Sequence, residues 1–185
     1  MRHRAIFLDR DGTLNVERSY ITTPAQLALL PGVGAAVAQL RAAGFLCVVV
    51  TNQSAIARGL MSVEDLDCIH EELRRQLAAS GAALDGIYAC HAMTEHPERK
   101  PAPGMLLRAA QELNIDVAGS WMIGDAQRDI QAGLAAGCRG CVLVRSGMPV
   151  EEIERAENVW MADDLLAAAQ LILSHHEAAS ARRIA

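Results

Sequence analysis

Short apolar segments alternate with longer amphipathic ones along most of this chain, and that alternation limits its fold more than any other feature. Segment 45–52, FLCVVVTN, is almost continuously apolar, as is typical of a strand buried on both faces of a parallel sheet. Segment 62–81 instead carries Leu66, Ile69 and Leu73 at helical spacing. The pattern therefore predicts an α/β fold of three layers, a Rossmann-like parallel sheet with helices on both faces.

The expected elements follow from the same reading of the chain. A helix start is predicted at Ser62, because Asp65 three residues later completes a capping box. A closing helix is expected to be capped by Asp163 or Asp164. Strands are predicted at 4–9, 45–52, 86–91, 120–125 and 140–147, with a short edge strand after residue 157, and the other helices at 31–44, 103–114 and 126–137.

Length and composition narrow the class of protein. The 185 residues, 51% of them hydrophobic, suit one domain, which we place at 1–175 with a frayed tail at 176–185. The formal charge of −5 disfavours nucleic acid and anionic membranes as partners. No apolar run approaches the roughly 20 residues that span a bilayer, and charged residues interrupt any signal-peptide pattern in residues 1–12. We therefore expect a cytoplasmic protein with no nucleic-acid or membrane partner.

The five cysteines lie in apolar segments and are odd in number. Cys138 and Cys141 have the C-x-x-C spacing, but they lie where a helix ends and a strand begins, whereas a redox pair opens a helix after a strand. We interpret the cysteines as reduced, small core residues.

Polar and charged side chains follow the apolar strands repeatedly. The carboxyl ends of parallel strands share one edge of the sheet, and doubly wound sheets bind their ligands there. Random placement would scatter such residues over both ends, so the pattern indicates a binding site. In chain order they are Asp9, Arg10, Asp11, Gly12 and Thr13; Thr51, Asn52, Gln53 and Ser54; Arg99 and Lys100; Gly124, Asp125 and Asp129; and Arg145, Ser146 and Gly147.

The residue types indicate phosphate chemistry at a metal ion. Burying two ionised carboxylates one residue apart is costly, so Asp9 and Asp11 predict a cation or a chemical role. With Asp125 they offer hard oxygen ligands of the kind that suit Mg²⁺. Beside Mg²⁺ and the ammonium of Lys100, one carboxylate could attack phosphorus, while a second protonates the leaving oxygen and later deprotonates water.

Four motifs resemble those of the haloacid dehalogenase (HAD) superfamily of phosphohydrolases. DRDGTLN at 9–15 resembles the first motif, D-x-D-G-[TV], and VVVTNQS at 48–54 resembles the second, a strand ending in Thr or Ser. Lys100 resembles the third-motif lysine, and MIGDAQRD at 122–129 the fourth motif, G-D-x-x-x-D. TNQSAIARGL, RKPAPGML and an essentially capless layout are most similar to the histidinol-phosphatase-like branch.

This resemblance implies a Mg²⁺-dependent phosphatase of a small sugar phosphate, most similar to those removing the 7-phosphate of a heptose bisphosphate. It implies Asp9 as nucleophile, forming an aspartyl-phosphate, and Asp11 as general acid and then base. Mg²⁺ would be held by the Asp9 carboxylate, the Asp11 backbone carbonyl and Asp125. The implied substrate-binding residues are Thr51, Asn52, Gln53, Arg58, Arg99 and Lys100, with loops 18–23 and 54–59 shaping the sugar pocket.

Two departures from the branch pattern affect these expectations. The branch usually carries a zinc loop, C-x-H…C-x-C, before R-K-P, whereas this chain has CHAMTEHPERKP. Cys90, His91 and His96 offer three ligands at best, so we do not expect structural zinc. Ala126 follows Asp125 where some relatives have lysine, which leaves Lys100 as the main catalytic ammonium.

The candidate residues also have plainer interpretations. Asp11 with Gly12 is a turn signal, Asp125 suits a helix N-cap, and Lys100 suits a solvated loop. Asp129, one helical turn after Asp125, is expected to support the site by hydrogen bonds rather than to bind metal.

Other functions stay open at this point. The second acid, Asp11, favours a phosphatase over a non-catalytic relative that binds a phosphorylated ligand or a protein. Histidinol phosphate and a nucleic-acid 3′-phosphate end are alternative substrates, and the acidic charge disfavours the second. The resemblance implies a monomer, and the sequence does not indicate the anomer of the sugar.

Overall fold

The computed structural model describes residues 2–147 and 156–184, and of residues 177–184 it describes the backbone alone. A 6-stranded, wholly parallel sheet forms its centre, with strand order β3-β2-β1-β4-β5-β6. This arrangement confirms the predicted three-layer α/β fold. The strands are β1 (Ala5–Leu8), β2 (Leu46–Asn52), β3 (Gly86–Cys90), β4 (Trp121–Gly124), β5 (Gly140–Val144) and β6 (Val159–Ala162).

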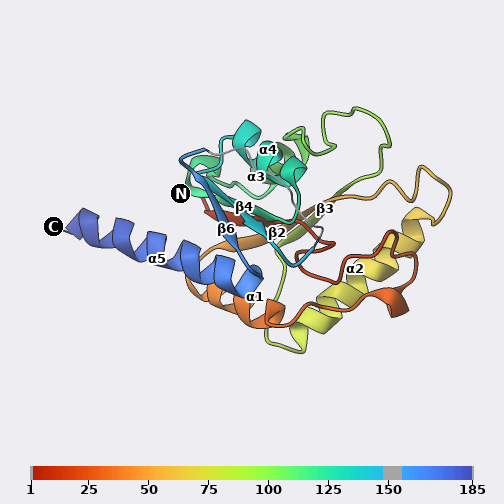
Figure 1. The fold of residues 1–185 in the computed structure, drawn as a ribbon, viewed down its shortest axis with the longest axis horizontal. Coiled ribbons are helices and arrows are strands. Elements are labelled where there is room, and N and C mark those ends of the chain that lie inside the picture. The colour runs from red at the N-terminus through yellow and green to blue at the C-terminus, as the bar shows by residue number, and fades with distance from the viewer. Residues whose placement is uncertain (1, 148–155, 185) are drawn as a thin grey trace.

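Helices cover both faces of the sheet (Figure 1). One face packs against α1 (Val33–Ala42), α2 (Val63–Ala78) and α5 (Leu165–Ile184). The other packs against α3 (Gly104–Glu112) and α4 (Gln127–Ala136). The structure adds two short 3₁₀ helices that the sequence pattern did not predict, η1 (Pro24–Gln26) and η2 (Val117–Gly119).

Strand β1 lies inside this sheet and is buried along its whole length. Its side chains alternate between the two apolar cores, with Ile6 and Leu8 in one and Ala5 and Phe7 in the other. In register, Phe7 faces Val48 of β2 on one side and Met122 of β4 on the other. Strand β1 therefore delivers the residues that follow it to a fixed point at the carboxyl edge of the sheet.

The predicted helix starts agree with the structure. Ser62 and Asp65 form the capping box, since each side chain accepts a hydrogen bond from the other residue's backbone N–H. Of the two candidate caps for α5, Asp164 accepts from the N–H of Ala167. Helix α5 runs on to Ile184 and projects beyond the sheet (Figure 1), so fraying of 176–185 stays a prediction, as does the single-domain boundary.

The strand order reverses between β1 and β4, because the chain runs outward from β1 to β3 on one side and from β4 to β6 on the other. Doubly wound sheets open a crevice at this reversal, beyond the carboxyl ends of the strands. The ends of β1, β2 and β4 therefore frame the expected site.

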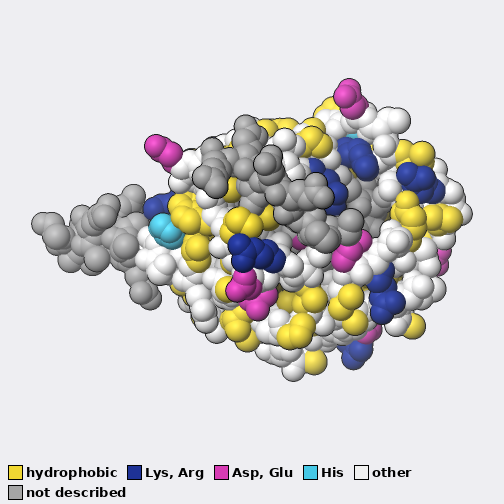
Figure 2. Space-filling model, in the orientation of Figure 1, with side chains coloured by type: hydrophobic (Ala, Val, Ile, Leu, Met, Phe, Trp, Pro, Cys, Tyr) yellow, Lys and Arg dark blue, Asp and Glu magenta, His cyan; other side chains and the backbone are white. Residues whose placement is uncertain are grey.

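Surface and membrane expectations are tested only in part. In the described chain, no helix combines the length and apolar character needed to cross a bilayer. The described part of the face in Figure 2 carries Lys and Arg side chains at separate points, with acidic and apolar side chains between them. The expectations of a monomer and of no nucleic-acid partner stay predictions.

Candidate active site

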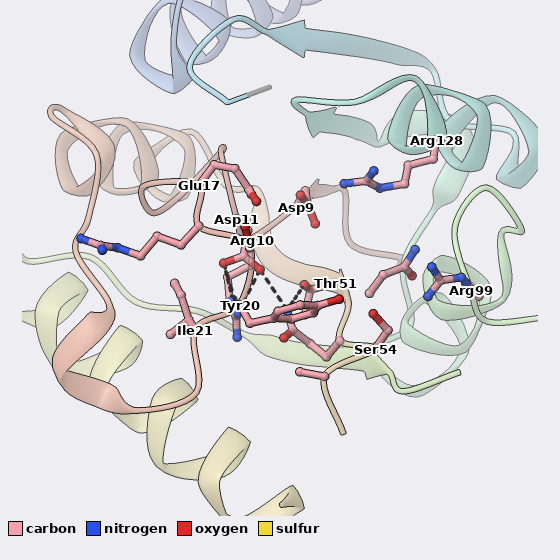
Figure 3. A pocket seen from close by; sticks show the side chains of 15 residues that line it. Asp9, Arg10, Asp11, Glu17, Tyr20, Ile21, Thr51, Ser54, Arg99 and Arg128 are labelled. Atoms are coloured by element: carbon pink, nitrogen blue, oxygen red, sulfur yellow. Dashed lines mark hydrogen bonds and ion pairs between the residues drawn. The ribbon is translucent and has the colours of Figure 1, made fainter. Parts of the chain in front are cut away.

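A cavity of about 210 Å³ opens at the carboxyl edge of the sheet. Residues 9–11, 17–21 and 51–55 line it together with Arg99 and Arg128. Figure 3 shows the Asp9 carboxylate, the Glu17 carboxylate and the Arg128 guanidinium directed into it. The cavity thus lies where the sequence pattern placed a binding site, and its lining mixes acids with arginines.

A buried ion-pair network lies directly behind the cavity. Lys100 Nζ is 2.5 Å from Asp9 Oδ1 and 2.7 Å from Asp129 Oδ1, and it also donates to the carbonyl oxygen of Val50 at 2.8 Å. Asp9 is 4% exposed, Lys100 2% and Asp129 0%. Lys100 therefore fixes the orientation of Asp9 from inside the protein, as the predicted convergence of β1, the β3–α3 loop and α4 requires.

Burial and neighbouring charges alter the acidity of this network. Burial raises the pKa of Asp9 to about 7 against the opposing effect of Lys100, and the carboxylates of Asp129 and Asp125 raise it further. Burial opposes the charge of Lys100, but the carboxylates of Asp129 and Asp9 outweigh it and raise the pKa of that ammonium. The single ammonium of Lys100 therefore does not balance the negative charge of the neighbouring aspartates.

Asp9, Asp125 and Asp129 form the group of described side chains best suited to a metal ion, with ligand atoms within 4.8 Å of one another. Glycines make room for Asp125, since a Cβ on Gly12 or Gly147 would lie 2.3 Å or 2.0 Å from Asp125 Oδ2. Buried carboxylates this close, packed against bare Cα atoms, fit a small divalent cation with oxygen ligands.

Asp129 differs from the other two acids in its hydrogen bonds. Its Oδ1 pairs with Lys100, and its Oδ2 accepts from the N–H of Ala126 at 3.0 Å. The ion pair and this backbone hydrogen bond already engage Asp129, which favours the supporting role expected for it.

Asp11 is oriented by three side chains. Arg10 Nη2 donates to Asp11 Oδ2 at 2.9 Å, Asn15 Nδ2 to Oδ1 at 2.9 Å, and Gln53 Nε2 to Oδ2 at 3.0 Å. The amide of Gln53 also donates to Thr51 Oγ1 at 2.8 Å. This network couples the loop after β1 to the end of β2 and leaves the Thr51 hydroxyl proton available to the cavity.

The predicted substrate-binding residues Asn52, Arg99 and Arg58 differ in their distance from the cavity and in their partners. The Asn52 side chain is bonded to the backbone of Lys100, whereas Arg99 lines the cavity and donates from Nη1 to the carbonyl oxygen of Ala92 at 2.6 Å. Arg58 is exposed and is not among the residues that line the cavity. From the two loops expected to shape the sugar pocket, residues 18–21 and 54–55 do line it.

Sequence reasoning assigned no role to three residues of this site. Arg10 is 1% exposed and forms an ion pair with Asp11. Its position in the sequence, between two motif acids, does not predict this contact. Glu17 lines the cavity, and its burial and the carboxylates of Asp11 and Asp125 raise its pKa to about 7. Arg128 lies inside the fourth motif at a variable position, so only its place on the first turn of α4 could have indicated it.

The incomplete zinc loop also has a described geometry. Cys90 Sγ lies 3.8 Å from His96 Nδ1, and this nitrogen accepts a hydrogen bond from the N–H of Glu98. The expectation of no structural zinc stays a prediction.

The fold and these acids define the class of HAD-like hydrolases, with a carboxylate pair after β1, a lysine beside it and a further acid after β4. Residues 98–168 match the family model described as HAD-hydrolase-like.

Proteins of similar sequence indicate which group of HAD-like hydrolases this chain belongs to. The chain is 44% identical to the D-glycero-beta-D-manno-heptose-1,7-bisphosphate 7-phosphatase of Yersinia pestis, over 87% of this chain and 90% of that protein. It therefore belongs to the family of these HAD-like phosphatases, which confirms the resemblance and the enzyme class, phosphoric monoester hydrolase.

Solved structures agree with this family. The D,D-heptose 1,7-bisphosphate phosphatase of B. bronchiseptica, complexed with magnesium and phosphate, has a TM-score of 0.86 and 35% identity, covering 93% of this chain and 99% of that one. The corresponding phosphatase of Burkholderia thailandensis has a TM-score of 0.67 and 33% identity, covering 92% and 99%.

Proposed function

We propose that this protein is a Mg²⁺-dependent phosphatase that hydrolyses D-glycero-D-manno-heptose 1,7-bisphosphate to heptose 1-phosphate. The single observation that carries the proposal is the ion pair of Lys100 with Asp9, buried at the end of β1 behind a cavity of about 210 Å³. The relatives named above support the heptose bisphosphate as substrate.

The residues present fit Mg²⁺. The carboxylates of Asp9 and Asp125 and the backbone carbonyl of Asp11 would hold it, since hard oxygen ligands suit this ion. When bound, it would supply positive charge that offsets the repulsion between Asp9 and an anionic phosphate.

In the first step, an Asp9 oxygen forms a bond to phosphorus and the bond from phosphorus to the sugar oxygen breaks, giving an aspartyl-phosphate. Asp11 gives its proton to the leaving sugar oxygen. In the second step, Asp11 takes a proton from water, the water oxygen bonds to phosphorus, and the bond to Asp9 breaks. Phosphate leaves, and both carboxyl groups return to their starting states.

The hydrogen bonds around Asp11 support this division of roles. Asn15 and Gln53 each donate one hydrogen bond to it, and Arg10 adds a charged donor that faces it from the buried side. Asp9 instead pairs with an ammonium. Donors of fixed direction suit a carboxyl group that must exchange a proton in one geometry, whereas an ion pair favours the ionised form of a nucleophile against the effect of burial.

A phosphate-release screen with Mg²⁺ tests the proposal. Its substrates are both anomers of heptose 1,7-bisphosphate, histidinol phosphate and a 3′-phosphorylated oligonucleotide. We expect kcat/KM for one heptose bisphosphate to exceed the value for the other substrates by at least about 10²-fold, since a site that pairs substrate charges rejects molecules lacking them. Faster turnover of histidinol phosphate would overturn the substrate assignment, and no release from any phosphate monoester would overturn the enzyme assignment.

A further inference from the structure

Three oxygen atoms of the protein already surround the ammonium of Lys100. The ammonium donates to Asp9 Oδ1 at 2.5 Å and to the carbonyl oxygen of Val50 at 2.8 Å, and it forms an ion pair with Asp129 Oδ1 at 2.7 Å. The side chain is fully buried and is not among the residues that line the cavity. Lys100 therefore orients Asp9, and a cation that lines the cavity is better placed for direct contact with a phosphoryl oxygen.

Besides Arg128, three arginines line the cavity, and Arg18 among them lies in the loop 18–23 that is expected to shape the sugar pocket. The other two have protein partners. Arg10 makes three hydrogen bonds to the carboxylate of Asp11. Arg99 donates to the carbonyl oxygen of Ala92. Ala126, directly after Asp125, has no donor in its side chain.

Arg128 is in a different situation. It extends from the first turn of α4, its guanidinium points toward Asp9 (Figure 3), and it is exposed to solvent at the edge of the cavity. Within the described part of the chain, no hydrogen bond or ion pair engages this guanidinium, although the charges of Asp129, Asp9, Asp125 and Glu17 act on it. A planar guanidinium offers paired donors that match two oxygens of a phosphate.

We propose that Arg128 binds the transferred phosphoryl group through two of its N–H groups and stabilises the charge on its oxygens as Asp9 attacks. This inference rests on the proposed function and makes Arg128 a catalytic residue of it. In this arrangement Lys100 holds the nucleophile, and Arg128 holds the group that it attacks.

Binding of inorganic phosphate in the presence of Mg²⁺, measured by calorimetry, tests this contact without turnover. We expect Arg128→Gln to weaken phosphate binding and lower kcat/KM by about 10- to 100-fold, the usual range for losing charged hydrogen bonds. Arg128→Lys keeps the charge but loses the paired donors, so it should fall between wild type and Arg128→Gln. The matched control is Arg139→Gln, an exposed arginine just before β5, at the opposite edge of the sheet, which should behave as wild type.

Two further measurements distinguish a direct contact with phosphate from damage to the metal site or the fold. The Mg²⁺ affinity and the midpoint of thermal unfolding should both be unchanged in Arg128→Gln. Phosphate affinity and kcat/KM within twofold of wild type would overturn the proposal, as would an equal loss of Mg²⁺ affinity. If the wild type binds phosphate through Arg128 but releases none from any monoester, the proposed function fails while the Arg128 contact stands.

Discussion

Asn52 and Lys100 are joined by a reciprocal pair of hydrogen bonds between a side chain and a backbone. Asn52 Nδ2 donates to the carbonyl oxygen of Lys100 at 3.0 Å, and the N–H of Lys100 donates to Asn52 Oδ1 at 3.1 Å. The last residue of β2 thereby fixes the loop that carries both Arg99 and the lysine. Asn52 thus holds the loop backbone and also lines the cavity, and its role in substrate binding stays a prediction.

Replacing Asn52 with Ala should loosen that loop. Two partly buried backbone groups lose their partners, so the free energy of unfolding should fall by about 1–3 kcal/mol. Because Lys100 then orients Asp9 less well, kcat should fall more than phosphate affinity. Urea unfolding and phosphate-release kinetics measure the two effects. An unchanged unfolding free energy would mean that these bonds do not hold the loop.

Asp9→Asn should abolish turnover and leave the fold intact. The amide has nearly the same size but is a poor nucleophile, so kcat should fall by at least about 10³-fold. Lys100 keeps Asp129 and the Val50 carbonyl as partners, which should preserve cooperative unfolding. Phosphate release and circular dichroism check the two parts. Wild-type turnover in this variant would remove Asp9 from the mechanism.

Gly12→Ala should impair the metal site specifically. The new Cβ would lie 2.3 Å from Asp125 Oδ2 and must displace it, and a displacement of this kind costs about 10²-fold in rate. We expect more Mg²⁺ to be needed for half-maximal phosphate release.

Gly44→Ala is the matched control for Gly12→Ala. Gly44 has a φ of +85° against +78° at Gly12, but its Cβ would meet open space. Both variants should lose about 1–2 kcal/mol of stability from the left-handed backbone. Equal Mg²⁺ requirements in the two would show that the contact with Asp125 is irrelevant.

His70 should make the protein less stable in mild acid. Burial and the charge of Arg10 lower its pKa from 6.5 to about 3, so between these values the unfolded chain binds a proton that the folded chain does not. Its contribution to stability therefore falls as pH drops below about 6.5, by up to about 1.4 kcal/mol per pH unit. His70→Leu should flatten that part of the profile, measured by urea unfolding at about pH 5, 6 and 7. Parallel profiles would contradict the assignment.

The fold was predictable because its strands carry a strong signal. The apolar segment 45–52 indicates a strand with both faces buried. The alternation of such strands with helices predicts a parallel sheet. The convergence of Asp9, Lys100 and Asp125 followed from the same logic, since all three come after strands at one edge. Their roles in catalysis stay predictions.

What the sequence could not supply is the direction of individual side chains. Arg58 lies in a segment expected to shape the pocket, but its N–H bonds to the carbonyl oxygen of Ser54 in a tight turn, and its side chain is exposed. The contacts of the Lys100 ammonium include Val50 and Asp129, which are distant from it in the chain. Such pairings depend on three-dimensional packing, and no local pattern encodes them.

The burial of β1 between two apolar cores has a consequence for how this enzyme can change. Asp9 is anchored by this interior strand, whereas residues 17–21 belong to a separate loop that also lines the cavity. Substitutions in this loop can remodel the mouth of the cavity without moving Asp9. Selection for a new sugar and retention of the old chemistry are thus largely independent demands on this molecule.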